Sequence, residues 1–292
     1  MNILIIGSGG REHAITWKVS QSEKVKNIYA IPGNPGIKME DKVQVFELHD
    51  PSIQDYINFA KEHNVDLTIV GPEAPLVDGI VDEFEKNGLL IFGPSKKAAQ
   101  LEGSKNFCKE ILNSGNVLTA KHQSFTDSIS AINYIKQHSL PIVIKADGLA
   151  AGKGVFILDD RDKASKLAND LFTGNVDGVT CNVIVIEEFL KGEEASFICL
   201  VSNDSIIPLA SSKDHKKLNN GDLGPNTGGM GAYSPTKLID DNLAKKVIKE
   251  IIKPTLNELK KRDINYSGFL YAGLMIDKNK NPYVLEYNCR LG

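Results

Sequence analysis

Short apolar runs alternate with helical patterns up to about residue 100. The runs lie at residues 3–6, 27–31, 43–46, 67–70 and 89–92. Short strands that alternate with helices are typical of a parallel sheet covered by helices. Several runs end in glycine- and proline-rich turns, which would meet at the carboxyl ends of the strands, where such sheets bind ligands. The pattern predicts a doubly wound α/β domain with a binding rim; plain turn chemistry is the alternative for the turns.

The pattern changes at Ser104, a good N-cap for an amphipathic helix that ends before Gly115. Predicted strands then follow at 142–145, 155–158, 183–187, 195–201 and 206–210, helices near 163–171 and 242–261, and a final hairpin at 269–277 and 282–290. This mixture predicts an α+β domain and not a continuation of the first sheet. We therefore expect two domains, 1–102 and 103–292.

Composition narrows the class of protein. Of the 292 residues, 41% are hydrophobic and 24% charged, which is ordinary for a soluble enzyme. The net charge of -3 gives no reason to expect nucleic acid as the main partner. No apolar run approaches the roughly 18 residues of a membrane span. The four cysteines are scattered, so we expect free thiols, a reducing compartment and a cytoplasmic location.

A glycine-rich loop follows the apolar run 141–144. Its lysines and glycines are Lys145, Gly148, Gly152, Lys153 and Gly154. Glycines let backbone N–H groups approach phosphate oxygens, and lysines neutralise the remaining charge. The P-loop template fails, because three residues separate the first two glycines and a glycine follows the second lysine. The loop predicts a nucleoside triphosphate ligand; a hairpin turn with solvated lysines is the alternative.

The segment 7–13 looks like a dinucleotide fingerprint but breaks it. Glu12 stands where the third glycine belongs, and the run 27–31 is not followed by the acid that would hold a ribose. A loop and helix amino terminus remain, with Arg11 in the first turn, which suits a lone phosphate. A phosphorylated small substrate therefore fits better than NAD, and a turn without a ligand is the alternative.

Two later strands carry polar groups that suit a nucleotide site. The run 183–190 offers an apolar edge for an adenine, and Glu194 follows it at a distance suited to the ribose hydroxyls. Strand side chains alternate, so Glu286, Asn288 and Arg290 share one face. A carboxylate and an amide oxygen suit Mg²⁺, and the guanidinium suits a carboxylate or phosphoryl group. Acidic strand ends that are merely solvated are the alternative, more so for Glu194 than for the row.

The stretch 213–231 contains almost no apolar residues. We expect a long irregular loop, which in a compact domain is functional or disordered. Asp214 is suited to accept hydrogen bonds from a substrate amine, and the turn 226–231 offers backbone donors.

Together, the segments 7–13, 71–79, 145–154, the Asp214 loop and 285–290 resemble one family throughout. It is the phosphoribosylamine-glycine ligase family, whose members are ATP-grasp enzymes of purine biosynthesis. The resemblance implies that the carboxylate of glycine attacks the γ-phosphoryl group of ATP to give glycyl phosphate, which the amine of 5-phosphoribosylamine captures. A non-catalytic ATP-binding fragment, a related purine-pathway carboxylase or formyltransferase, and an NAD-dependent oxidoreductase are the alternatives.

The resemblance also implies an N-terminal pre-ATP-grasp domain, an ATP-grasp domain with a lid-bearing subdomain at about 122–192, and a set of site residues. The implied ATP contacts are Lys105, Lys145, Gly148, Gly152, Lys153, Gly154, Glu187, Glu188, Phe189, Leu190 and Glu194. Glu286 and Asn288 would bind Mg²⁺ (or Mn²⁺). The implied substrate contacts are Gly9, Gly10, Glu73, Asp214, Asn226, Gly228, Gly229 and Arg290, with Arg290, Asp214 and Lys145 as the catalytic group.

Two features depart from the family pattern. The strand before the metal-binding row, 271–275, carries no acid, so the metal shell would depend more on water and phosphate. The family signature continues from Arg-Leu-Gly into Asp-Pro-Glu, whereas this sequence stops at Gly292. We therefore expect that the C-terminal part of the family architecture is absent from this chain.

Overall fold

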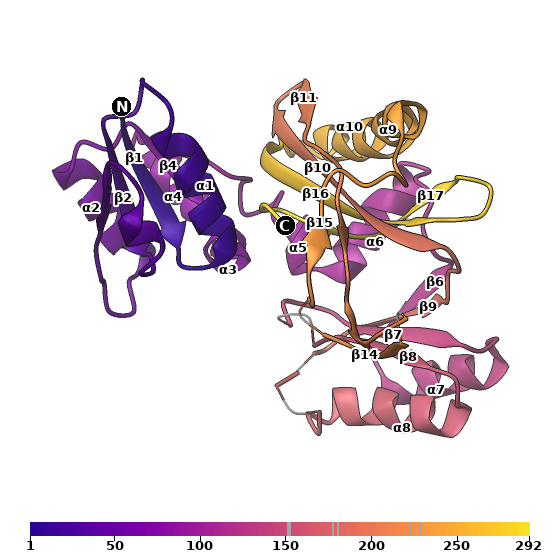
Figure 1. Cartoon of the computed structure of the whole chain (residues 1–292). Coiled ribbons are helices and arrows are strands. Elements are labelled where there is room, and N and C mark those ends of the chain that lie inside the picture. The colour runs from indigo at the N-terminus through magenta and orange to yellow at the C-terminus, as the bar shows by residue number, and fades with distance from the viewer. Residues whose placement is uncertain (151–152, 177, 180, 222, 228) are drawn as a thin grey trace.

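The computed structural model describes residues 1–150, 153–176, 178–179, 181–221, 223–227 and 229–292. Three larger sheets and two short two-stranded ribbons organise these residues. The first sheet lies to one side of the molecule, and the other two lie one above the other beside it (Figure 1).

The first sheet is parallel, with strand order β3-β2-β1-β4-β5. Its strands are β1 (Asn2–Gly7), β2 (Asn27–Pro32), β3 (Val43–Val45), β4 (Leu67–Val70) and β5 (Ile91–Phe92). The surrounding helices are α1 (Gly10–Ser20), η1 (Ile37–Met39), α2 (Ile53–Glu62), α3 (Glu73–Asp78) and α4 (Ile80–Lys86). Leu4 and Ile6 pack toward α2 and α4, whereas Ile3 and Ile5 pack toward α1. Because β1 is apolar on both faces and both are covered, the predicted doubly wound domain is confirmed.

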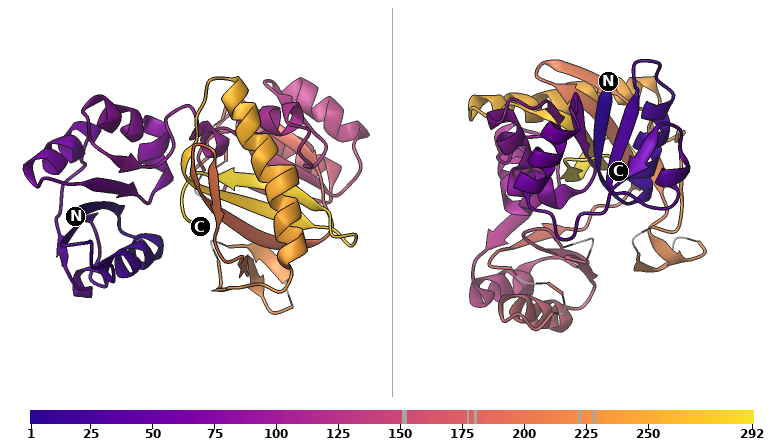
Figure 2. Two further views of the ribbon diagram at one scale, coloured as in Figure 1. Left: turned by 90° about the horizontal axis from the view of Figure 1, so that it is seen from above. Right: turned by 90° about the vertical axis from the view of Figure 1, so that its left-hand side faces the viewer.

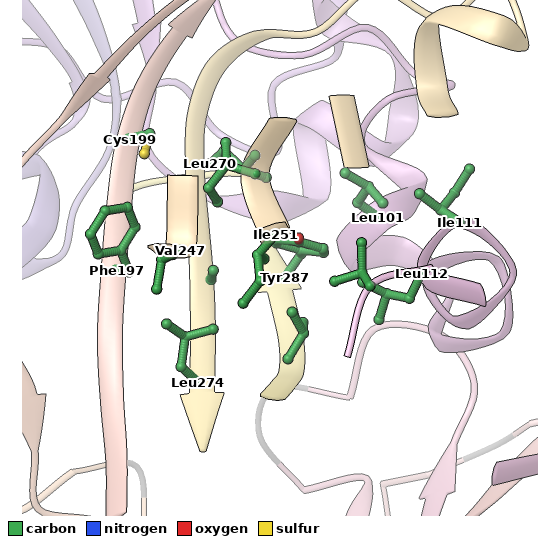
Figure 3. Close-up of a cluster of buried hydrophobic side chains, with 14 of the residues drawn as sticks. Leu101, Ile111, Leu112, Phe197, Cys199, Val247, Ile251, Leu270, Leu274 and Tyr287 are labelled. Atoms are coloured by element: carbon green, nitrogen blue, oxygen red, sulfur yellow. The ribbon is translucent and has the colours of Figure 1, made fainter. Parts of the chain in front are cut away.

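The second sheet is antiparallel, with order β11-β10-β16-β17. Its strands are β10 (Glu193–Ser202), β11 (Ser205–Pro208), β16 (Ser267–Ile276) and β17 (Pro282–Asn288). A long helical segment made of α9 (Asp241–Val247), the π-helical turn η2 (Ile248–Ile252) and α10 (Lys253–Lys261) crosses one face (Figure 2). Phe197, Leu270 and Leu274 pack against this segment, and so does Tyr287, whose hydroxyl lies 2.7 Å from that of Thr255 (Figure 3).

Two short helices connect the first sheet to the rest of the chain. They are α5 (Gln100–Gly103) and α6 (Lys105–Ser114). The hydroxyl of Ser104 accepts the N–H of Phe107 at 3.1 Å, and Gly115 is the C-cap, so the predicted helix and its N-cap are confirmed.

The third sheet is antiparallel, with order β6-β9-β7-β8. Its elements are β6 (His122–Phe125), α7 (Ser128–Gln137), β7 (Ile142–Ala146), β8 (Val155–Leu158), α8 (Arg161–Phe172) and β9 (Ile184–Glu188). The sequence patterns did not predict β6 and α7, because β6 is largely polar and α7 buries only Ala131 and Ile135. The helices α7 and α8 cover the face of the sheet that carries Ile142, Ile144 and Ile186. The other face is turned toward the second sheet (Figure 1).

The expectation of an irregular loop at 213–231 was wrong. Short antiparallel ribbons form there, β12 (Lys213–Asp214) with β15 (Ala232–Tyr233) and β13 (Lys217–Asn219) with β14 (Leu223–Asn226). Backbone hydrogen bonds between the paired strands order this segment, although it contains few apolar side chains. In the described part of the chain, no helix is both long and apolar enough to cross a membrane.

Candidate active site

Alternation along the strands places polar side chains between the second and third sheets. On β7 and β9, Lys145 and Glu187 point away from the face that α7 and α8 cover. On β10 and β17, Glu194 and Glu286 point away from the face that packs on α9 and α10. Residues that are remote in sequence therefore meet between two sheets whose outer faces are closed by helices.

Two lysines border this space. The Nζ atom of Lys145 donates to the carbonyl of Leu285 at 2.9 Å, next to Glu286 in the chain. Lys105, the first residue of α6, donates to the carbonyl of Gly148 at 2.8 Å. Burial lowers the pKa of Lys105, and the charges of Glu286 and Asp147 oppose this shift. The carboxylate of Asp147 also accepts the N–H of Asn106 at 3.1 Å, so the start of the glycine-rich loop is attached to α6.

The predicted row on β17 presents two oxygen ligands side by side. Glu286 and Asn288 are half-buried, whereas Tyr287 and Cys289 are buried. Among the described residues, the Glu286 carboxylate has no hydrogen-bond or ion-pair partner; the Asn288 Oδ1 atom accepts from Arg290 at 3.1 Å. This donor set fits Mg²⁺ or Mn²⁺. The described residues contain no group of three or more His, Cys, Asp and Glu that suits a metal, so water and phosphate would complete the shell.

Arg290 contacts acidic residues of two helices that precede the second and third sheets in the chain. Its Nε atom lies 3.5 Å from the carboxylate of Glu73 on α3, and its Nη2 atom lies 3.1 Å from that of Glu102 on α5. Arg11, from the first turn of α1, lies 3.9 Å from the same Glu73 carboxylate. Burial, followed by the charge of Arg290, lowers the pKa of Arg11. The phosphate-suited start of the chain and the β17 row are thereby parts of one charged network.

Glu102 is a residue of this network that the sequence patterns did not predict. Its Oε2 atom accepts the N–H of Cys289 at 2.7 Å and lies 3.1 Å from the Cys289 sulfur. Burial raises the pKa of Glu102, and the charge of Arg290 opposes this shift. The sequence signal that could have indicated a role for Glu102 was an acidic residue close to Ala99 and Leu101, which are buried.

Lys216 was also missed. Its Nζ atom lies 3.2 Å from the Glu194 carboxylate and 3.8 Å from that of Asp214. Burial would lower the pKa of Lys216, but the carboxylates of Glu194 and Glu286 outweigh burial and raise it. Two predicted site carboxylates thus lie within ion-pair distance of Lys216, which a ribose at Glu194 would have to displace or share.

The predicted adenine edge divides into two environments. The side chain of Glu187 is 2% exposed and pairs with lysines. Its backbone lies between β6 and β7, paired with His122 and Val143, so the expectation of a free strand edge was wrong at this residue. Glu188, Phe189 and Leu190 are half-buried at and just beyond the end of β9. The side chain of Glu188 accepts the N–H of Lys121 at 2.9 Å.

The remaining predicted residues lie on turns. Gly148 has a left-handed φ of 100°, Lys153 is exposed and Gly154 is buried. Gly9 and Gly10 are exposed at the start of α1, and Gly229 is exposed beside the β13–β14 ribbon, which ends at Asn226. Gly152 and Gly228 lie outside the described residues.

The broken fingerprint at the start of the chain has a structural cause. The Glu12 carboxylate is buried and accepts the N–H of Gly9 at 2.6 Å. It fills the space beside Gly7 and Gly71, where any added Cβ would overlap it. The Glu12 carboxylate therefore fills the turn at which a dinucleotide fingerprint has a glycine and no side chain. This difference argues against the oxidoreductase alternative.

A doubly wound domain is followed by two facing sheets, one carrying Lys145 and the other carrying the oxygen donors Glu286 and Asn288. This arrangement defines an ATP-grasp ligase. The solved N5-carboxyaminoimidazole ribonucleotide synthetase shares this fold, with a TM-score of 0.71 at 18% identity over all of this chain and 70% of that one. The biotin carboxylase domain of the Hydrogenobacter thermophilus 2-oxoglutarate carboxylase, solved with MgADP, also shares this fold. Its TM-score is 0.76 at 16% identity, over all of this chain and 64% of that one.

The chain belongs to the phosphoribosylamine-glycine ligase family. Residues 1–102 match the family model of the phosphoribosylglycinamide synthetase N domain, and residues 103–292 match that of its ATP-grasp (A) domain. The Yersinia pestis and Escherichia coli O157:H7 phosphoribosylamine-glycine ligases are 50% and 49% identical over all 292 residues, which cover 68% of each relative. The solved Thermotoga maritima enzyme is 34% identical with a TM-score of 0.85, over all of this chain and 69% of that one.

Proposed function

We propose that this chain uses ATP to join glycine to 5-phosphoribosylamine, giving glycinamide ribonucleotide, ADP and phosphate through glycyl phosphate. The observation that carries the proposal is the arrangement of the two lysines in a member of this family: Lys105 contacts the glycine-rich loop and Lys145 contacts β17, the strand of Glu286 and Asn288. Phosphoryl transfer depends on positioning and on neutralising charge more than on covalent help from the protein, and these groups suit both tasks.

The nucleotide would lie between the second and third sheets. Lys105 and Lys145 would contact its phosphates, the backbone that leaves β9 at 188–190 its adenine, and Glu194 its ribose. The loop 148–154 would close over the phosphates, with Lys153 and the glycines as contacts, and keep water from the acyl phosphate. Support comes from the contact between Lys105 and the Gly148 carbonyl, because it joins the loop to a lysine that is proposed to contact the phosphates.

A divalent cation, Mg²⁺ or Mn²⁺, would be held by Glu286 and Asn288 and would neutralise phosphate oxygens. Arg290 would orient the glycine carboxylate or the phosphoryl group, and Asp214 would accept hydrogen bonds from the attacking amine. Phosphoribosylamine would contact Gly9, Gly10 and Glu73, with backbone donors from Asn226, Gly228 and Gly229. Support comes from the ion pair of Arg290 with Glu73, since these two proposed substrate contacts lie 3.5 Å apart.

The domain division that we propose is 1–102 and 103–292, with a lid-bearing subdomain at about 122–192. We also propose a cytoplasmic location, since the four cysteines are free and buried.

The test is ADP release by the purified chain with glycine and phosphoribosylamine added singly and together, with mass spectrometry of the product. We expect release only when both are present, and a product of the mass of glycinamide ribonucleotide. ATP binding by calorimetry without any product would favour a non-catalytic fragment. ADP release that does not depend on glycine but requires bicarbonate or formate would favour the carboxylase or formyltransferase alternative.

A further inference from the structure

A buried carboxylate shares one oxygen between two lysines at the junction of the sheets. The Oε1 atom of Glu187 lies 2.9 Å from the Nζ atom of Lys145 and 3.1 Å from that of Lys109. The side chains of Glu187, Lys145 and Lys109 are 2%, 8% and 4% exposed. They come from β9, β7 and α6, so tertiary packing creates the cluster.

Both ammonium groups are also attached to the backbone of β17. Lys145 donates to the Leu285 carbonyl, whereas Lys109 donates at 2.7 Å to the hydroxyl of Thr119. That hydroxyl donates in turn to the carbonyl of Val284 at 2.7 Å. The two lysines are therefore held beside consecutive residues of the strand that carries Glu286.

The charges in this cluster do not cancel. Among the residues that the structure describes, Glu187 is the single carboxylate within ion-pair distance of either ammonium group. Burial raises the pKa of the neighbouring Cys108 thiol to about 11, so this group stays neutral near pH 7. The two lysines hold the pKa of Glu187 below its ordinary value although burial opposes them. Burial lowers the pKa of Lys109, and the charge of Glu187 opposes this shift. With both lysines protonated, one positive charge is left over, and a buried charge is costly unless an anion meets it.

We propose that Lys109 is a positioning residue for nucleotide binding: by sharing Glu187, it leaves Lys145 with positive charge for the triphosphate. The inference rests on the proposed function, in which Lys145 contacts ATP. Without Lys109, Glu187 and Lys145 would form a closed pair of equal and opposite charge, and the phosphates would compete with Glu187 for Lys145. Lys109 itself need not touch the nucleotide.

The experiment compares dissociation constants for adenosine 5′-(β,γ-imido)triphosphate with Mg²⁺, measured by calorimetry on the full chain. Lys109→Met should weaken binding by about tenfold, the change that corresponds to one charge interaction of ordinary strength. The double variant K109M/E187Q, in which Lys145 has no counter-charge, should bind within about threefold of the unaltered chain. A role of Lys109 in packing alone predicts no such rescue.

Lys246→Met is the matched control. Lys246 is a part-buried lysine that donates to Asn281 at 2.9 Å, in the turn between β16 and β17, away from the cluster. K246M should keep the unaltered affinity. If K109M does not fold, as judged by circular dichroism, K109Q replaces it, since glutamine still offers Thr119 a donor without the charge. The inference is overturned if the double variant binds as weakly as the single one, or if the single variant binds as well as K246M.

These measurements separate the inference from the proposed reaction, because binding needs neither glycine nor phosphoribosylamine. A chain that shows loss and rescue of binding but forms no product contradicts the reaction and supports the inference. A chain that forms product but shows no rescue contradicts the inference alone.

Discussion

The carboxylate of Glu102 lies 3.1 Å from the Nη2 atom of Arg290, so the last residue of the N-domain match contacts a residue just beyond the final strand. The same carboxylate accepts the backbone N–H of Cys289 at 2.7 Å. Arg290 in turn donates to Asn288, a proposed metal ligand. The junction of the two matched regions is therefore in direct contact with the proposed catalytic groups.

Glu102→Gln should raise the KM for glycine by about tenfold and leave the Kd for ATP within about threefold. Glutamine still accepts the Cys289 N–H, but it lacks the charge that orients the Arg290 guanidinium. Steady-state kinetics and calorimetry provide the two values. Glu258→Gln is the control, because Glu258 is also largely buried and lies 3.6 Å from an arginine, Arg262, away from the site. An equal loss of glycine and ATP affinity in E102Q would point to a general structural defect.

The same carboxyl group predicts a pH dependence of stability. Burial raises the pKa of Glu102 above its ordinary value of 4.5, so the folded chain binds this proton more tightly than the unfolded chain. Its contribution to the free energy of unfolding is therefore greatest below pH 4.5 and falls as the pH rises through the folded pKa. Urea unfolding from pH 4 to pH 7 should show the stability of the unaltered chain falling relative to E102Q. A constant difference across this range would contradict the prediction.

Gly71→Ala should destabilise the first domain by about 1–3 kcal/mol, the usual cost of overpacking. The added Cβ would overlap the buried carboxylate of Glu12, which must then move away from the Gly9 N–H. Gly10→Ala is the control for stability, because a Cβ at Gly10 meets no atom within 4 Å. Urea unfolding of both variants checks the prediction, which fails if the two variants are equally stable.

Glu286→Gln should raise the Mg²⁺ concentration needed for half-maximal ATP binding by about tenfold or more, because it removes the one charged ligand of the proposed site. Calorimetric ATP titrations at a series of Mg²⁺ concentrations give this value. Glu193→Gln is the control, since Glu193 is an exposed carboxylate that pairs with Lys213 at 2.8 Å. An unchanged Mg²⁺ requirement in E286Q would remove Glu286 from the metal site.

Local patterns predicted much of the fold. The strands of the first sheet, the helix capped by Ser104 and the hairpin of β16 and β17 were all expected from runs, caps and turns. The misses have a common reason, since β6, α7 and the ribbons at 213–231 bury few apolar side chains. Their order comes from cross-strand pairing and from packing on β7 and β9, which a local pattern does not contain.

The sequence by itself determined the alternation of faces on β17, and with it the shared face of Glu286 and Asn288, because alternation depends only on neighbouring residues. The strand ends at Asn288, so the expectation that it continues to Arg290 was wrong. The sequence also determined the family, through motifs that occur in order. Only the tertiary structure decided which charges meet: Lys109 with Glu187, Lys216 with Glu194 and Glu102 with Arg290. Lys109 and Glu187, like Glu102 and Arg290, are far apart along the chain, and packing of separate elements brings them within a few ångströms, where Coulomb interactions act.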